Sequence, residues 1–257
     1  MKILRNKHFL FFLGFLLIIG IWFLVSLLVD RGSMIFPSPI VTFKEMFILL
    51  GKEATYKYLG FSIVRLIIGF FSSLLLAFLL GILVNRNEHL YQFFTPLMTF
   101  LKAAPTATFT FLFLVLLNGQ DAPIFVVIFM TFPILYESIV GALKSTSETV
   151  LDAAKVDGAN RLKTLFYVQL PLGMPYISLG IVSTFGLAFK VEIMAEIIMG
   201  LTKGGLGAMI YLSRNGTSNL TRMFAYSLMA IILVLLVSVL TSLIKGKLKK
   251  LSSVAAE

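Results

Sequence analysis

The chain has 257 residues, of which 58% are hydrophobic and only 13% are charged. Soluble domains carry about twice that share of charged residues, so the composition indicates a membrane protein. The chain contains no cysteine and only two histidines, which excludes disulfides and thiolate metal sites and leaves too few ligands for a histidine metal cluster. The net charge of +10 fits basic residues placed at the cytoplasmic ends of membrane spans, so we expect membrane lipid, and no nucleic acid, as a partner.

Six segments have the length and apolar character of transmembrane helices, since a helix needs roughly 20 residues to cross the hydrocarbon core. Three of them carry no charge at all, whereas the third span extends back across Lys102 and the fifth begins after Pro171 and Pro175. The sequence therefore predicts an all-α, polytopic membrane protein with six transmembrane helices. In chain order, these helices are expected at residues 9–29, 66–84, 91–120, 122–143, 174–198 and 223–244.

The N-terminal basic residues Lys2, Arg5 and Lys7 precede an apolar run, as they do in a secretion signal. The uncharged run 9–29 is longer than a signal core, and no cleavage site of small residues follows it. We therefore expect a retained first helix. Lysines also gather at residues 245–250, and positive charge favours the cytoplasmic side, so both termini are predicted to be cytoplasmic.

Two long loops are expected to have structure of their own. In the outer loop, Pro37-Ser38-Pro39 forms a stiff turn, and the segment 40–59 has apolar residues at helical spacing, which predicts a helix along the outer interface. In the cytoplasmic loop 145–171, Ser145 and Glu148 have the spacing of a capping box. A short helix is expected from there to Gly158.

A second short helix is expected to begin at Asn160 and to be stopped by Leu170-Pro171 before the next span. The loop also carries a spaced pattern that resembles the cytoplasmic signature of ABC importer permeases. It reads Asp152-Ala153-Ala154, then Gly158, then Val168, Leu170 and Pro171. Asp152 departs from the glutamate usual in the family but keeps the carboxylate.

In that family this loop is a coupling helix that docks on a separate ATPase. The resemblance therefore implies that the ATPase-coupling residues are Asp152, Ala153, Ala154, Gly158, Leu170 and Pro171. Further matches in order along the chain resemble the nitrate, sulfonate and taurine-type subfamily of these permeases. They are Pro37-Ser38-Pro39, Arg65 and Gly69, Pro105, Ala195-Glu196 and Gly205-Leu206-Gly207.

The resemblance implies the fold of a type I ABC importer permease, with residues 1–257 as one transmembrane domain. Its parts would be an extra N-terminal helix at 9–29, core helices at about 63–244 and the coupling loop at 145–171. Implied partners are two copies of a cytoplasmic ABC ATPase, an extracytoplasmic solute-binding protein and a second permease copy, all at a bacterial plasma membrane. The solute would be a sulfonate-, nitrate- or taurine-like anion, a thiamine precursor or a similar small organic molecule.

The chain has no phosphate-binding loop of the G-x-x-x-x-G-K-[ST] form, so we expect ATP hydrolysis in the partner and no catalytic residue here. We expect no cofactor and no metal site either. Apart from Glu137, which lies near the inner end of the fourth span, four charged residues fall within the expected spans, where such groups usually face a cavity or a partner. They either line a translocation path or extend toward the headgroups, and they are Lys102, Lys190, Glu192 and Glu196.

Glu137 and Lys144 are expected at the inner interface. Glu192 and Glu196 lie four residues apart, on one face of a helix. They allow a second function, an ion- or proton-coupled secondary transporter that uses the two carboxyls as a relay. A third, a membrane-embedded enzyme, is remote because the sequence offers no ligand set or nucleophile–base pair.

Overall fold

The computed structural model describes residues 7–29, 36–85, 87–117, 121–200 and 204–254, and all regular elements in these ranges are helical. This confirms the all-α fold. Lys2, Arg5 and Arg86 lie outside the described residues. The helices are α1 (Lys7–Val29), α2 (Pro39–Leu50), α3 (Glu53–Asn85), α4 (Glu88–Ala103), α5 (Thr106–Leu116), α6 (Ala122–Lys144), α7 (Glu148–Val156), α8 (Arg161–Thr164), α9 (Leu170–Met199), α10 (Leu206–Asn215) and α11 (Leu220–Val254), with a π-helical turn, Leu165–Gln169, between α8 and α9.

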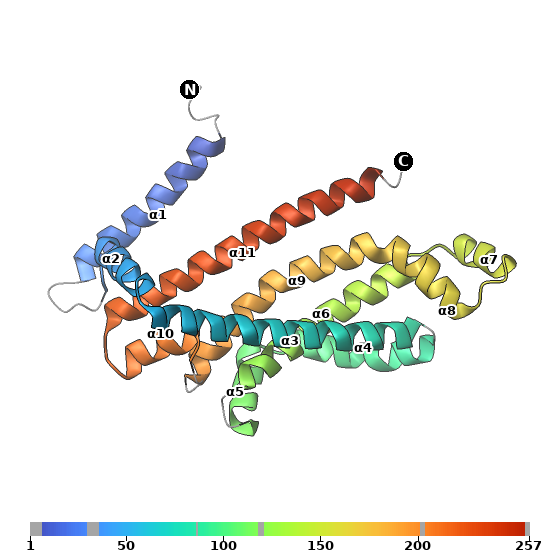
Figure 1. Ribbon diagram of the computed structural model, residues 1–257, viewed down its shortest axis with the longest axis horizontal. Helices are drawn as coiled ribbons and strands as arrows, with labels where there is room; N and C mark the ends of the chain where they lie inside the picture. Colours follow the sequence, from blue (N-terminus) through green and yellow to red (C-terminus); the bar gives the residue numbers. More distant parts are fainter. Residues whose placement is uncertain (1–6, 30–35, 86, 118–120, 201–203, 255–257) are drawn as a thin grey trace.

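The centre of the bundle is α6, which packs between α3 and α9. Its buried side chains join those of α3, α4, α5 and α9 in one large apolar core. A second apolar cluster lies among α2, α10 and α11 and includes Ile193 of α9. Figure 1 shows α7 and α8 at one end of the molecule and α2 and α10 at the other, so α9 runs from the loop 145–171 to the opposite end.

Within the described residues, three helices are long and apolar enough to cross a membrane: α3, α6 and the part of α11 at Leu220–Gly246. The bent pair α4–α5 makes a fourth if it is counted as one span. The described apolar part of α1, Leu13–Val29, is a shorter helix. The count of six spans therefore stays a prediction.

The third expected span is not one straight helix. It is divided into α4 and α5, which meet at an angle of 95° (Figure 1). Pro105 causes the break, because a proline forces the residue before it out of the helical region, and Ala104 has an extended backbone (φ −70°, ψ 131°). Counting apolar residues did not detect this break, since the stretch is apolar on both sides of the proline.

The second expected span begins earlier than its apolar run. Helix α3 starts at Glu53, and the interfacial helix expected over 40–59 is divided at Gly51 into α2 and the first turns of α3. Thr55 fixes this corner by donating a hydrogen bond to the carbonyl of Leu49 (2.7 Å). Met46 and Leu49 are buried in the second apolar cluster, so α2 is a packed element of the bundle.

Two expectations for the loop 145–171 were wrong. The N-cap of α7 is Ser147, whereas Ser145 ends α6 and donates to the carbonyl of Ala142, so Ser145 and Glu148 form no capping box. Pro171 does not stop a helix, because α8 continues through the π-helical turn into α9. The wider turn suits a proline that lacks an N–H and needs room at the preceding carbonyls.

Candidate functional site

Helix α7 stands clear of the bundle. None of its residues is buried, Ala153 is exposed, Ala154 is half-buried and the side chain of Val156 is 88% exposed. Asp152 pairs with Lys155 (2.7 Å) on the exposed surface of the helix rather than with its N-terminal turn. An exposed apolar side chain among small residues gives this helix a surface that another protein can approach closely.

The chain leaves α7 through a left-handed glycine, at the residue where the sequence predicts the helix to end. Gly158 has φ +76°, the amide of Ala159 donates to the carbonyl of Ala154 (2.9 Å), and the amide of Gly158 donates to that of Lys155 (3.0 Å). These two bonds form a Schellman motif, which satisfies carbonyls at a helix end. Any side chain at position 158 would strain this backbone, although the space around it is open.

The base of the loop is tied to the bundle by the π-helical turn. Gln169 accepts a hydrogen bond from Asn85 of α3 (3.0 Å) and donates one to the carbonyl of Leu143 of α6 (3.3 Å). Leu165 and Leu170 are buried beside it, whereas Pro171 is exposed. A push on α7 would therefore reach α3, α6 and α9 together.

A buried ion pair lies at the other end of α9. The carboxylate of Glu196 accepts hydrogen bonds from Arg65 Nη1 (2.7 Å), Ser62 Oγ (2.7 Å) and the amide of Gly207 (2.9 Å). Arg65 also donates to the carbonyl of Gly204 (2.6 Å). Because Glu196 is fully buried, the alternative in which it extends toward the headgroups is wrong. This cluster joins α3, α9 and the start of α10.

The glycines beside this carboxylate allow the close approach. Gly204 and Gly205 have φ of +109° and +136°, which L side chains rarely adopt. A Cβ at Gly207 would lie 2.6 Å from both the Cβ of Glu196 and the carbonyl oxygen of Ile193. The segment before α10 therefore packs directly on α9, and only glycine fits there.

Glu192 lies one turn before Glu196 and is also fully buried, and neither of its carboxyl oxygens has a hydrogen-bond partner among the described residues. Lys190, in contrast, is exposed. The structure thus separates the four charged residues of the spans. Glu192 and Glu196 are inside the chain, while Lys190 and Lys102 are on its surface.

Lys102 belongs to a second, exposed ion pair. Its ammonium contacts both carboxylate oxygens of Glu137 on α6 (2.8 and 2.7 Å), and the two side chains are 43% and 49% exposed. Glu137 lies well inside a helix apolar enough to span the membrane. Sequence reasoning missed this pairing, because the residues lie on different helices 35 positions apart. Exposed charges at such a place favour a face that meets water or another protein rather than lipid.

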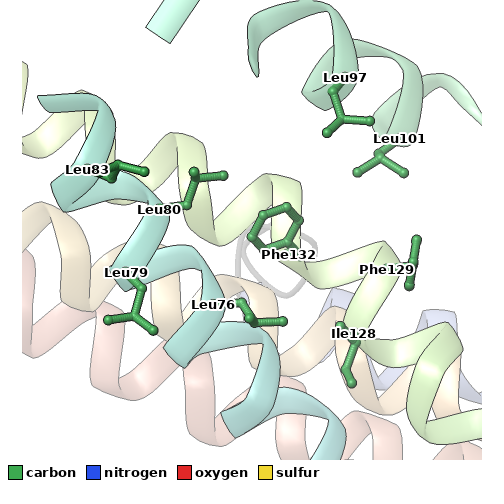
Figure 2. A pocket seen from close by; sticks show the side chains of 9 residues that line it. All are labelled: Leu76, Leu79, Leu80, Leu83, Leu97, Leu101, Ile128, Phe129 and Phe132. Carbon is green, nitrogen blue, oxygen red and sulfur yellow. The ribbon is translucent and has the colours of Figure 1, made fainter. Parts of the chain in front are cut away.

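The opposite side of α4 is apolar. Figure 2 shows Leu97 and Leu101 of α4 facing leucines of α3 and Phe132 of α6 across a cavity of about 590 Å³. All nine side chains that line this cavity are hydrophobic. This face suits hydrocarbon, whereas the face with Lys102 and Glu137 does not. Helix α4 therefore divides an apolar side of the bundle from a polar one.

The comparison with known families agrees with this architecture. Residues 73–250, more than half of the chain, match the family described as "Binding-protein-dependent transport system inner membrane component". The chain belongs to this family. It is therefore an ABC importer permease and a membrane protein. The apolar helices of the structure agree with this membership.

Among its relatives, the bicarbonate transport system permease protein CmpB of Synechococcus elongatus is 31% identical, over 73% of this chain and 69% of that protein. The taurine transport system permease protein TauC of Escherichia coli is 21% identical, over 75% of this permease and 72% of the relative. The nitrate import permease protein NrtB of Leptolyngbya laminosa is 26% identical and covers 91% and 84%. These relatives are transport permeases with different solutes in their names.

Solved structures share the fold of this permease. A structure of the MetNI methionine ABC transporter in an inward-facing conformation matches with a TM-score of 0.59 and 21% identity, over 79% of this chain and 98% of that one. A bacterial alginate ABC transporter, solved with a pentasaccharide-bound periplasmic protein, matches with a TM-score of 0.59 and 17% identity, over 93% and 96%. The expected ABC permease fold is thereby confirmed, and the secondary-transporter alternative is not favoured.

Proposed function

We propose that this protein is the membrane subunit of an ATP-driven importer for a small solute, with ATP hydrolysed by a separate ATPase that docks on α7. The observation that carries the proposal is the geometry of α7, which has no buried residue and ends at a left-handed glycine outside the bundle. Asp152, Ala153 and Ala154 are the residues on α7 that would meet the ATPase. Gly158 shapes the turn, and Leu170 and Pro171 anchor the loop to α9.

The coupling would run through one nearly continuous helix. Helix α8 passes through the π-helical turn into α9, which ends at Met199 beside the Glu196 cluster. When ATP binding draws two ATPase subunits together, each α7 moves with its subunit. The movement then reaches α3 and α6 through Gln169 and the far end through α9, so access to the path can change from one side to the other.

The path itself would form between two copies of the permease. A single chain presents the Lys102–Glu137 pair on its surface, where facing a second copy would shield it from lipid and leave it open to water. Glu192 and Glu196 support this path from inside the chain rather than lining it. Lys190 is on the surface and is available to the outer opening.

The solute is proposed to be small and polar, within the range of sulfonate-, nitrate- and taurine-like anions, thiamine precursors and similar molecules. The names of the relatives support this range, since they include bicarbonate, nitrate and taurine permeases. An extracytoplasmic binding protein would deliver the solute to the outer end, where α2 and α10 lie (Figure 1).

The test is co-purification of the ATPase with two loop variants, Gly158→Val and Ala154→Trp, from native membranes. The first strains a left-handed backbone and the second adds bulk to the docking surface. An interface anchor commonly contributes about 2 kcal/mol, so the affinity of each variant for the ATPase should be about thirtyfold lower. Less ATPase should therefore co-purify with it. ATP-driven uptake should fall with it.

The matched control is Leu235→Ala, which removes an exposed apolar side chain from α11. Insertion and dimerisation should be unchanged in all three variants. Normal ATPase recovery and normal uptake in both loop variants would overturn the docking role of α7 and leave the loop as a simple connection.

A further inference from the structure

A second cavity of about 220 Å³ lies between α4 and α6, on the polar side of α4. It is distinct from the apolar cavity of Figure 2, which lies between α3, α4 and α6. The side chains that give it its character are aromatic, hydroxyl-bearing or charged: Tyr91, Thr95, Thr99, Tyr136, Glu137 and Lys144.

Tyr136 forms part of the wall of this cavity. Its side chain is only 2% exposed, and its hydroxyl is buried with no partner in the described part of the chain. A buried tyrosine hydroxyl normally has a partner, since leaving it unpaired costs free energy. Because the hydroxyl has no accessible surface, a molecule in the cavity meets the ring of Tyr136 rather than its hydroxyl.

The threonines add acceptors on the α4 side. Thr95 donates its hydroxyl proton to the carbonyl of Tyr91 (2.8 Å), and Thr99 donates to the carbonyl of Thr95 (3.0 Å). Their donors are thus used, while their oxygens can still accept. The cavity therefore offers at least two free acceptors.

The charges around the cavity are balanced. Glu137 pairs with Lys102 (2.7 Å), and Lys144 pairs with Glu88 (2.8 Å) and lies over the ring of Tyr91 at 3.3 Å. Two positive and two negative groups leave no net charge. Glu137 and Lys144 are seven residues apart on α6, so they lie on one face about 10 Å apart along the helix axis.

We propose that this cavity is a binding site on the solute path for a small molecule without net charge, either a zwitterion or a neutral dipolar compound. The proposal rests on the proposed function, because that function places this face of α4 and α6 on the path. The donor end of the solute would meet the carboxylate of Glu137, its acceptor end would meet the ammonium of Lys144, and a donor between them would meet the hydroxyl oxygens of Thr95 and Thr99. This narrows the range of solutes proposed above to its zwitterionic and neutral members, because a cavity with no excess of positive charge gives no preference to nitrate-like inorganic anions.

The lack of native cysteines allows a direct test with thiol reagents. Thr99→Cys and, one turn away, Thr95→Cys place a thiol in the cavity of the full-length permease. Inside-out membrane vesicles are treated with anionic sulfonatoethyl methanethiosulfonate or cationic trimethylammonioethyl methanethiosulfonate, which are similar in size. The ratio of their rates is compared with the ratio at Tyr167→Cys, a cytoplasmic control position whose native side chain is 81% exposed.

We expect both reagents to react in the cavity, with a rate ratio within about threefold of the control. Adding Lys102→Ala should shift the ratio about fivefold toward the cation, and adding Glu137→Gln should shift it about fivefold toward the anion, since each change leaves one charge unbalanced. Neither change should alter the ratio at Tyr167→Cys.

Three results would overturn the proposal. The first is a labelling-rate ratio at the cavity cysteines, without further substitutions, that favours the anionic reagent by tenfold or more. The second is that both cavity cysteines stay unreactive while Tyr167→Cys reacts. The third is a rate ratio that Lys102→Ala and Glu137→Gln leave unchanged. The labelling needs neither ATP nor transport. A failure here therefore counts against the cavity alone, whereas a failure of ATPase recovery counts against the proposed function.

Discussion

Two ion pairs of the same length differ in how deeply they are buried. Arg65–Glu196 and Lys102–Glu137 both join nitrogen and oxygen at 2.7 Å, but the first pair is 8% and 0% exposed and the second is 43% and 49% exposed. The buried pair is fixed by Ser62, Gly207 and the carbonyl of Gly204. The exposed pair has no such partners in the described residues.

Burial determines whether an ion pair is held rigidly or can exchange partners. A buried pair must recover its lost hydration through further hydrogen bonds, so it becomes rigid, and here it holds α3, α9 and the start of α10 together. An exposed pair keeps its water and can exchange partners with a passing solute. On the function proposed above, the buried pair would serve the fold and the exposed pair would serve transport.

The largest effect should come from breaking the buried pair. Arg65→Met removes the cation and leaves the Glu196 carboxyl buried with one partner fewer, which should destabilise the permease by about 3–5 kcal/mol. Lys102→Met is the matched control and should cost about 1 kcal/mol or less. Thermal unfolding of both variants in detergent measures the difference. Equal losses of stability would contradict the division between the two pairs.

A smaller effect should follow from crowding the buried pair without touching its charges. In Gly207→Ala, the added Cβ meets the backbone of Ile193 and the side chain of Glu196, which should cost about 1–3 kcal/mol. Gly141→Ala is the control, because a Cβ there meets nothing within 4 Å and alanine favours a helix. The same unfolding measurement applies, and a Gly207→Ala permease as stable as Gly141→Ala would show that the corner is loosely packed.

The smallest effect on stability should come from reversing the exposed pair. Lys102→Glu places two carboxylates together and Glu137→Lys two ammonium groups, yet each should shift stability by about 1 kcal/mol or less because water screens the charges. Uptake should fall severalfold in each single variant and recover in the double exchange. If uptake in both single variants equals that of the wild type, the pair has no part in transport.

Much of this arrangement is visible in the sequence, but not the contacts that give it meaning. The approximate positions of the long helices followed from apolar length, and the end of the short helix at Gly158 followed from the glycine itself. Arg65 and Gly205-Leu206-Gly207 were singled out only as matches to a subfamily, whereas Glu196 was also noted as a charge within a span. The meeting of Arg65 with Glu196 and Gly204 depends on packing between residues 131 or more positions apart, which no local pattern encodes.

The breaks in the helices were harder to predict for a different reason. Hydropathy is the same on both sides of Pro105, and the polar first turns of α3 look like a loop when only apolar residues are counted. The free hydroxyl of Tyr136 was also out of reach, because a tyrosine in an apolar helix gives no sign that its partner is missing. Such features depend on three-dimensional neighbours rather than on composition.

The proposed docking of α7 on an ATPase can be tested by cross-linking the exposed end of α7 to its partner. Val156→Cys places a single thiol at the exposed end of α7, in a chain without other cysteines. A photoactivatable maleimide on this thiol should join the permease to an ABC ATPase in native membranes, whereas the same reagent on Leu235→Cys of α11 should not. If Val156→Cys forms no cross-link to an ATPase although the complex is otherwise intact, α7 does not dock on the ATPase.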